Sequence, residues 1–202
     1  MGFDKLAAPL RGIPVLQRSL EALLAVNAIT EIIVVGPEER WEFFGAMKFP
    51  KPVRRVDGGK TRQDSVAAGL AVITTDFVAV HDGARPLIAA GDIARCIETA
   101  YLHQAVALAR RVTETVKRSD ASDCNIGSIS REHLWLMETP QVFATALLRE
   151  AYTKISADHL TVTDEVSALE ALGVQVKFIE SHHPNLKITT PADLALAEAS
   201  LI

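Results

Sequence analysis

The segment His81-Asp82-Gly83-Ala84-Arg85-Pro86 carries side chains suited to metal and phosphate chemistry, and it directly follows the apolar run Phe77-Val-Ala-Val80. In open α/β sheets, ligands bind at the carboxyl ends of strands, so an aspartate here could hold Mg²⁺ beside triphosphate oxygens. Arg85 could pair bidentately with a phosphate. The residues alone allow a structural alternative equally well, in which an Asp–Arg pair fixes the loop.

A Gly-Gly turn forms a second candidate site, within the segment Asp57-Gly-Gly-Lys-Thr-Arg-Gln-Asp-Ser-Val66. Gly58 and Gly59 precede a predicted helix start, where the free amides of the first turn favour anions. Ser65 could donate a hydrogen bond to a base or a phosphate. A tight turn capped by Thr61 explains the same residues, and for such a turn alone this structural explanation is the commoner one.

Charged side chains also occur in two later segments. Thr161 to Glu170 predicts a capped helix start, and either acid of its first turn could bind a metal or order a basic side chain. In Asn185-Leu-Lys-Ile-Thr189, a lysine between two apolar residues could present its ammonium group to a phosphate. Taken singly, Lys187 and Lys5 are explained as well by ordinary solvated lysines.

The elements that must position these residues alternate between strands and helices. Short apolar runs fit strands covered on both faces. These runs are Glu31–Gly36, Phe77–His81, Gln104–Ala109 and Val174–Ile179. Helical periodicity and cap residues predict helices that open at Pro14, cover Thr61–Ile73 and Ile93–Leu102, and follow Thr190. We therefore expect a single α/β domain over residues 1–202, with a mostly parallel sheet and helices on both faces.

One polar region breaks this alternation. Arg111 to Ser130 alternates weakly and holds the turn-rich stretch Ser119-Asp-Ala-Ser-Asp123. This pattern predicts a hairpin arm at about 111–130 that projects from the sheet. Such an arm could clasp a second subunit.

The composition and net charge of the chain exclude several classes of function. The chain is 49% hydrophobic and 23% charged, and its net charge of −4 argues against a nucleic-acid partner, which needs a clustered basic excess. Cys96 and Cys124 form no C-x-x-C pair, and the histidines have no metal-ligand spacing. No signal peptide opens the chain, and no apolar run approaches the roughly 20 residues that span a bilayer. We expect a reduced, cytoplasmic setting without a membrane partner.

In this order along the chain, the segments resemble the 2-C-methyl-D-erythritol 4-phosphate cytidylyltransferase family of the non-mevalonate isoprenoid pathway. The resemblance spans essentially the whole chain. It rests on Gly58–Val66, His81–Pro86, Thr139–Gln141, Thr163–Ser167 and Asn185–Thr189. It implies a Rossmann-like nucleotidyltransferase sheet with a dimer-forming β-arm. It also implies Mg²⁺-dependent transfer of CMP from CTP to methylerythritol phosphate, with release of pyrophosphate.

The resemblance implies roles for single residues. Asp82 matches the Mg²⁺ ligand, and Lys5 and Lys187 match lysines that offset charge on the phosphates. Nucleotide contacts are matched by Gly58, Gly59, Ser65, Ala84 and Arg85. Contacts to the sugar-alcohol phosphate are matched by Thr115, Arg131 and Thr139, with Arg131 reaching from the partner's arm. Glu114 stands where the family usually has an aspartate, which preserves the charge.

The front of the chain departs from the family. Family members begin with a strand and an A-A-G-x-G-x-R-M loop that cradles the triphosphate, and the stretch Met1-Gly-Phe-Asp-Lys5 matches from that loop's final methionine. We therefore expect the strand and the loop to be absent from the chain as given. Either the sequence is incomplete or the element is lost, and the first is favoured because a missing central strand exposes unpaired backbone groups.

Two other functions remain open. One is a cytidylyltransferase with the same fold and chemistry that acts on ribitol 5-phosphate. The stretch Gly83-Ala84-Arg85 and the segment around Arg131 favour methylerythritol phosphate over it. The other is a non-catalytic nucleotide-binding homologue that lacks the triphosphate loop.

Overall fold

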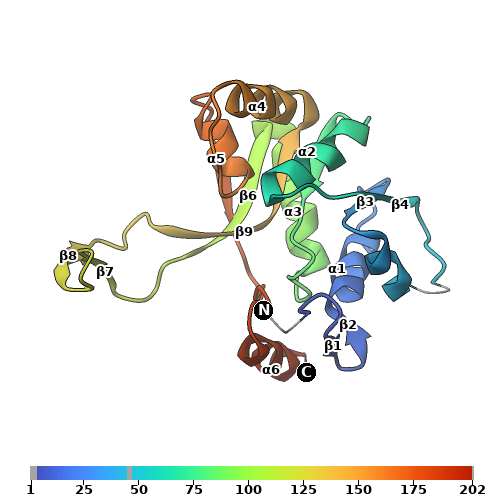
Figure 1. Cartoon of the computed structure of the whole chain (residues 1–202), viewed down its shortest axis with the longest axis horizontal. Coiled ribbons are helices and arrows are strands. Elements are labelled where there is room, and N and C mark those ends of the chain that lie inside the picture. Colours follow the sequence, from blue (N-terminus) through green and yellow to red (C-terminus); the bar gives the residue numbers. More distant parts are fainter. Residues whose placement is uncertain (1–3, 45–46, 202) are drawn as a thin grey trace.

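The computed structural model of the chain describes residues 4–44 and 47–201 (Figure 1). The helices are α1 (Val15–Leu24), α2 (Arg62–Val72), α3 (Ala90–His103), α4 (Thr145–Ala157), α5 (Glu165–Glu170) and α6 (Pro191–Ser200), with a 3₁₀ helix η1 (Glu38–Phe44). The strands are β1 (Pro9–Leu10), β2 (Ile13–Pro14), β3 (Ile32–Val35), β4 (Val53–Val56), β5 (Phe77–Val80), β6 (Ala105–Arg111), β7 (Val116–Ser119), β8 (Asn125–Ile129), β9 (Trp135–Ala144) and β10 (Lys177–Glu180).

The main sheet has four strands in the order β10-β6-β9-β5. Strands β10 and β6 are parallel, and β9 runs antiparallel to both β6 and β5. Strands β5, β6 and β10 therefore point the same way, and β9 is the exception. A separate parallel pair, β3 and β4, lies beside this sheet. The prediction of a mostly parallel α/β sheet is confirmed.

Helices cover both faces of the sheet because alternate side chains of its strands point to opposite sides. From β6, Val106 and Leu108 pack with Ile93 of α3, whereas Ala105 packs with Leu148 of α4. All residues from Ala105 to Ala109 are buried, which explains the continuous apolar run seen in the sequence. The predicted strand at Val174–Ile179 begins only at Lys177.

Two predicted helix starts are confirmed in atomic detail. The Thr61 side chain accepts a hydrogen bond from the Asp64 amide and the Asp64 carboxylate accepts one from the Thr61 amide, which is a capping box at the start of α2. Thr190 and Asp193 form the same motif at the start of α6, where Pro191 is the first helical residue.

The polar region forms the predicted hairpin arm. Strands β7 and β8 pair antiparallel with each other and extend away from the rest of the molecule (Figure 1). Nearly every residue of the arm is exposed, including the apolar Ile126 at 58%. The arm is joined to the body through β6 and β9, which pair with each other in the main sheet.

Both cysteines are free thiols, with Cys96 buried on α3 and Cys124 exposed near the tip of the arm. Among the helices in the described part of the chain, none has the length and apolar character needed to cross a bilayer.

Candidate active site

An ionised carboxylate between two cations lies at the carboxyl end of β5. Asp82 Oδ2 is 2.7 Å from Lys187 Nζ, and Asp82 Oδ1 is 3.5 Å from Arg62 Nε. Burial raises the Asp82 pKa, but the hydrogen bond to Lys187 and the charges of Lys187 and Arg62 outweigh it, so the pKa lies below its ordinary value. Asp82 is therefore charged at neutral pH. The structure thus brings together two predicted site residues, Asp82 and Lys187, that are far apart in the sequence.

Arg62 is held in place by a fully buried acid. Its guanidinium donates two hydrogen bonds of 2.7 Å to the Glu165 carboxylate, which also accepts a hydrogen bond of 3.1 Å from the Tyr152 hydroxyl. The Glu165 side chain is 0% exposed. Of the roles that the sequence allowed for the acids in the first turn of α5, Glu165 has the ordering of a basic side chain. Asp164 caps α5 by accepting a hydrogen bond from the Ser167 amide.

A chain of hydrogen bonds supports the backbone at Asp82. The Asp82 amide donates to Thr139 Oγ1 at 3.0 Å, and Thr139 Oγ1 lies 2.9 Å from His81 Nδ1. His81 Nε2 is 3.3 Å from the Arg85 carbonyl oxygen. This network assigns the proton to Nε2, so that Thr139 donates to Nδ1. Burial lowers the His81 pKa to about 4, so the imidazole is neutral at pH 7.

Arg85 contacts the backbone of neighbouring segments. Its guanidinium donates to the Asn185 carbonyl oxygen at 2.6 Å and to the Met137 carbonyl oxygen at 3.3 Å. Arg85 therefore fixes the loop, as the structural alternative proposed, but through carbonyl groups and not through an ion pair with Asp82. The buried Ala84 accepts a hydrogen bond from the Ile188 amide at 2.8 Å, which ties the loop to the segment that carries Lys187.

The Gly-Gly turn lies against the start of α2. The Gly59 amide donates to Ser65 Oγ at 3.1 Å, and Ser65 Oγ donates to the Thr61 carbonyl oxygen at 2.9 Å. A Cβ atom at Gly59 would lie 2.1 Å from Asp64 Cβ, which is far inside van der Waals contact. Only glycine fits there.

Gly59→Ala should lower the free energy of unfolding by about 1–3 kcal/mol, because the added methyl group displaces Asp64 and breaks the capping box. Chemical denaturation of the purified variant measures the loss. Gly58→Ala is the matched control: its Cβ would lie 3.0 Å from Ser65 Oγ, a side-chain end that can rotate away, so we expect a smaller loss. Equal losses in the two variants would contradict the steric argument.

Three predicted site residues lie apart from this cluster. Arg131 and Thr115 are exposed near the base of the arm, where the Arg131 guanidinium donates to the Thr113 carbonyl oxygen. Lys5 is half-buried, and no ion pair within the described ranges involves it. The predicted match at the end of the family's loop also involves residues 1–3, which lie outside the described residues.

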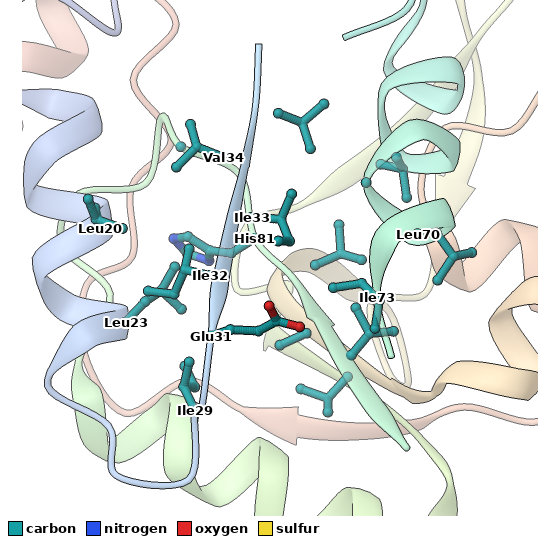
Figure 2. Close-up of a pocket in the computed structure, with 18 of the residues that line it drawn as sticks. Leu20, Leu23, Ile29, Glu31, Ile32, Ile33, Val34, Leu70, Ile73 and His81 are labelled. Carbon is teal, nitrogen blue, oxygen red and sulfur yellow. The ribbon is translucent and has the colours of Figure 1, made fainter. Parts of the chain in front are cut away.

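A cavity of about 720 Å³ opens beside the cluster. Its wall includes Asp82 and Arg62 at one end, and the edges of β3 and β5 along its length. Figure 2 shows Leu20 and Leu23 on one side of β3, and Leu70 and Ile73 on the other side. The cavity is apolar over most of its length, so it differs in character from the charged cluster at its end.

Comparison with known proteins decides the family. A model of the family 2-C-methyl-D-erythritol 4-phosphate cytidylyltransferase matches residues 1–202. The chain belongs to this family.

Relatives and solved structures agree with this cytidylyltransferase assignment. The chain is similar to the 2-C-methyl-D-erythritol 4-phosphate cytidylyltransferase of Prochlorococcus marinus, with 40% identity over 98% of this chain and 91% of the relative. The crystal structure of the Thermus thermophilus enzyme of that name matches with a TM-score of 0.82 at 33% identity, over 96% of this chain and 92% of that one. The Francisella tularensis structure matches with a TM-score of 0.85 at 31% identity, over 98% and 94%.

The side chains of this cytidylyltransferase site fit a Mg²⁺ ion that is bound together with a nucleotide. Within residues 4–44 and 47–201, no group of three or more His, Cys, Asp or Glu side chains could hold a metal ion. Mg²⁺ is usually bound through one or two carboxylates together with substrate phosphates, so the single carboxylate of Asp82 fits a metal that arrives with a nucleotide.

Sequence reasoning did not single out Arg62 as a site residue. The sequence points to Arg62 only indirectly. Glu165 stands in the largely apolar stretch Glu165-Val-Ser-Ala-Leu169, and an acid that is buried needs a cationic partner. That signal predicts that a partner exists but does not say which residue it is.

Proposed function

We propose that the protein transfers CMP from CTP to 2-C-methyl-D-erythritol 4-phosphate for isoprenoid synthesis, with Mg²⁺ as cofactor and pyrophosphate as the second product. Family membership supports the reaction class. The observation that carries the proposal is the cluster in which Asp82 lies between Lys187 and Arg62, at the carboxyl end of a strand in an α/β sheet. A cytoplasmic location belongs to the same proposal, and the two free thiols are consistent with a reducing compartment.

The proposed reaction requires that the two substrates are aligned and that positive charge lies close to the reacting phosphate. A phosphate oxygen of the sugar-alcohol phosphate attacks the α-phosphorus of CTP, the bond from that phosphorus to the bridging oxygen breaks, and pyrophosphate leaves. The Lys187 ammonium group can turn from Asp82 to the α-phosphate, where its charge stabilises the transition state. Mg²⁺ held by Asp82 would neutralise further phosphate charge. Arg62 stays fixed by Glu165 and keeps a second positive charge beside Asp82.

Pyrophosphate release tests the proposal directly. The protein is incubated with CTP and Mg²⁺, and with either methylerythritol 4-phosphate or ribitol 5-phosphate. We expect faster release with methylerythritol 4-phosphate. Preference for ribitol 5-phosphate would overturn the substrate, and CTP binding without turnover of either acceptor would indicate a non-catalytic homologue.

Arg131→Ala should raise the KM for the sugar-alcohol phosphate much more than the KM for CTP, because the proposed contact of Arg131 is with that phosphate. Steady-state kinetics with each substrate varied in turn measures both constants. Arg118→Ala is the matched control, since Arg118 is also an exposed arginine of the arm. A similar change in both KM values, or the same change in the control, would contradict this role.

A homodimer formed through the arm is also part of the proposal. The arm projects from the body and exposes Ile126, as expected of a segment that docks on a partner (Figure 1). If Arg131 reaches the partner's site, then mixing the Lys187→Ala and Arg131→Ala proteins restores one intact site in each mixed dimer. At equal amounts, and at a sugar-alcohol phosphate concentration far below the raised KM of the Arg131 variant, the mixture should have about a quarter of wild-type activity. A mixture no more active than its components would rule out the shared site.

A further inference from the structure

Lys187 lies between two anchored residues in the segment that joins β10 to α6. On one side of it, the amide of the buried Ile188 donates to the Ala84 carbonyl oxygen at 2.8 Å. On the other side, the carbonyl oxygen of the buried Asn185 accepts a hydrogen bond of 2.6 Å from the Arg85 guanidinium. The place of the Lys187 ammonium group therefore depends on how these two anchors hold the backbone.

The side chain of Asn185 strengthens the second anchor. Its Nδ2 donates to Glu138 Oε2 at 2.9 Å and to the Thr139 carbonyl oxygen at 2.9 Å. A carbonyl oxygen can only accept, so this contact fixes the orientation of the amide, with Nδ2 toward β9. Within the described ranges, Asn185 Oδ1 is buried and has no hydrogen-bond partner. The side chain of Asn185 is thus held through its contacts with two neighbouring residues of β9.

Glu138 is a buried acid with a loose ion pair. Burial raises the pKa of its carboxyl group above the ordinary value, which means that burial disfavours the charged form. Arg110 Nε lies 3.7 Å from Glu138 Oε1, and the Arg110 side chain is half-exposed, so this pair offsets little of the cost of burial. The contact with Asn185 is much closer. Stability alone gives little reason for an acid here, whereas the contact with Asn185 fixes a segment of the site.

Strand β9 also holds the other side of the charged cluster. Thr139 Oγ1 accepts a hydrogen bond of 3.0 Å from the Asp82 amide, and the adjacent residue Glu138 binds Asn185. Two successive residues of one strand therefore fix the backbone of Asp82 relative to the segment of Lys187. Between these two segments, Asp82 Oδ2 lies 2.7 Å from Lys187 Nζ.

We propose that Glu138 is a positioning residue, which acts through Asn185 to hold the Lys187 ammonium group beside Asp82. The catalytic part of this inference rests on the proposed function, in which the charge of Lys187 stabilises the transition state. A shift of about 1 Å in a group of this kind can lower the rate about 10²-fold. Because the charge acts on the reacting phosphate, loss of Glu138 should lower kcat more than it changes the KM for CTP.

The first test measures the place of Lys187 without turnover. The whole chain is labelled briefly with acetic anhydride, and mass spectrometry gives the rate at each lysine. Glu138→Met cannot accept a hydrogen bond from Asn185, so Lys187 should lose its ion pair and react about threefold faster. Glu138→Gln should keep the wild-type rate, because its amide oxygen still accepts that hydrogen bond. Lys154 is the matched control, since it lies 2.8 Å from Asp158 and is 43% exposed, against 39% for Lys187.

The second test measures the catalytic effect. Glu138→Met should lower kcat for cytidylyl transfer by about 10- to 100-fold. In a Lys187→Ala background the same substitution should lower kcat no further, because Glu138 acts through that lysine. Asp92→Met is the matched control: Asp92 is also a buried acid, and its partner Arg95 binds the Glu180 carbonyl oxygen at the start of the same connection. This control should keep the wild-type kcat.

Several results would overturn the positioning role. These are an unchanged labelling rate at Lys187 in Glu138→Met, an equal rise at Lys154, a Gln variant that behaves like the Met variant, or a kcat loss that persists without Lys187. Glu138→Leu gives the same comparison if the Met variant folds poorly. Absence of pyrophosphate release from the wild-type protein would overturn the proposed function instead, and the labelling rates would still decide whether Glu138 holds Lys187 in place.

Discussion

Asp82→Asn should lower kcat/KM for cytidylyl transfer by about 10³-fold or more, because it removes the charge that the proposed function places at the centre of the site. The shape of the side chain is kept. The free energy of unfolding should change by less than about 1 kcal/mol, since Lys187 is 39% exposed and water can solvate its ammonium group when the partner is lost. Kinetics and denaturation on the same preparation separate the two effects.

Asp92→Asn is the matched control for that experiment. Asp92 is also an acid held by basic side chains, with Arg95 at 2.6 Å and His183 at 3.3 Å, but it is buried on α3 and shares none of the partners of Asp82. Its substitution should lower stability and leave kcat/KM nearly unchanged. If Asp82→Asn keeps its turnover, or if the two variants lose activity alike, Asp82 has no place in the reaction.

Arg62→Met should lower the free energy of unfolding by about 3 kcal/mol, because it leaves the fully buried carboxylate of Glu165 without its cationic partner. Among the residues that the structure describes, only the Tyr152 hydroxyl would still donate to that carboxylate. The double variant Arg62→Met, Glu165→Gln should recover part of the loss, since it removes the buried charge as well. Denaturant titration of both variants gives the two values and their difference.

Arg54→Met is the control for the buried pair. Arg54 also forms an ion pair, with Glu31 at 2.9 Å, but its side chain is 51% exposed, so its loss should cost less than about 1 kcal/mol. If Arg62→Met is no more costly than Arg54→Met, the contact with Glu165 contributes little to stability. The double variant is then expected to show no recovery.

The parts of the fold that local patterns determine were predictable. Strands β3 and β5 are short apolar runs, and the starts of α2 and α6 carry their own capping residues. Strand β9 was not predicted. It contains Pro140, and a proline argues against a central strand because it cannot donate to the ladder, yet β9 lies between β6 and β5.

The site was predictable only where one segment carried the signal. Asp82 and Lys187 each follow a pattern in their own segment, and the structure brings them within 2.7 Å. The contact of Arg62 with Glu165 joins residues 103 positions apart, and nothing local to either residue names the other. The guanidinium of Arg85 binds backbone carbonyl groups, which its own segment did not indicate, and its contact with a phosphate stays a prediction.

The arm has a consequence for how the chain can be cut. Its tip, between Ser119 and Asn125, is exposed, and the strands on either side of the arm, β6 and β9, are held together inside the main sheet. A protease that nicks the tip should therefore leave two fragments that remain associated. The same tip is a suitable place for new termini in a circular permutant, provided that the original ends can be linked.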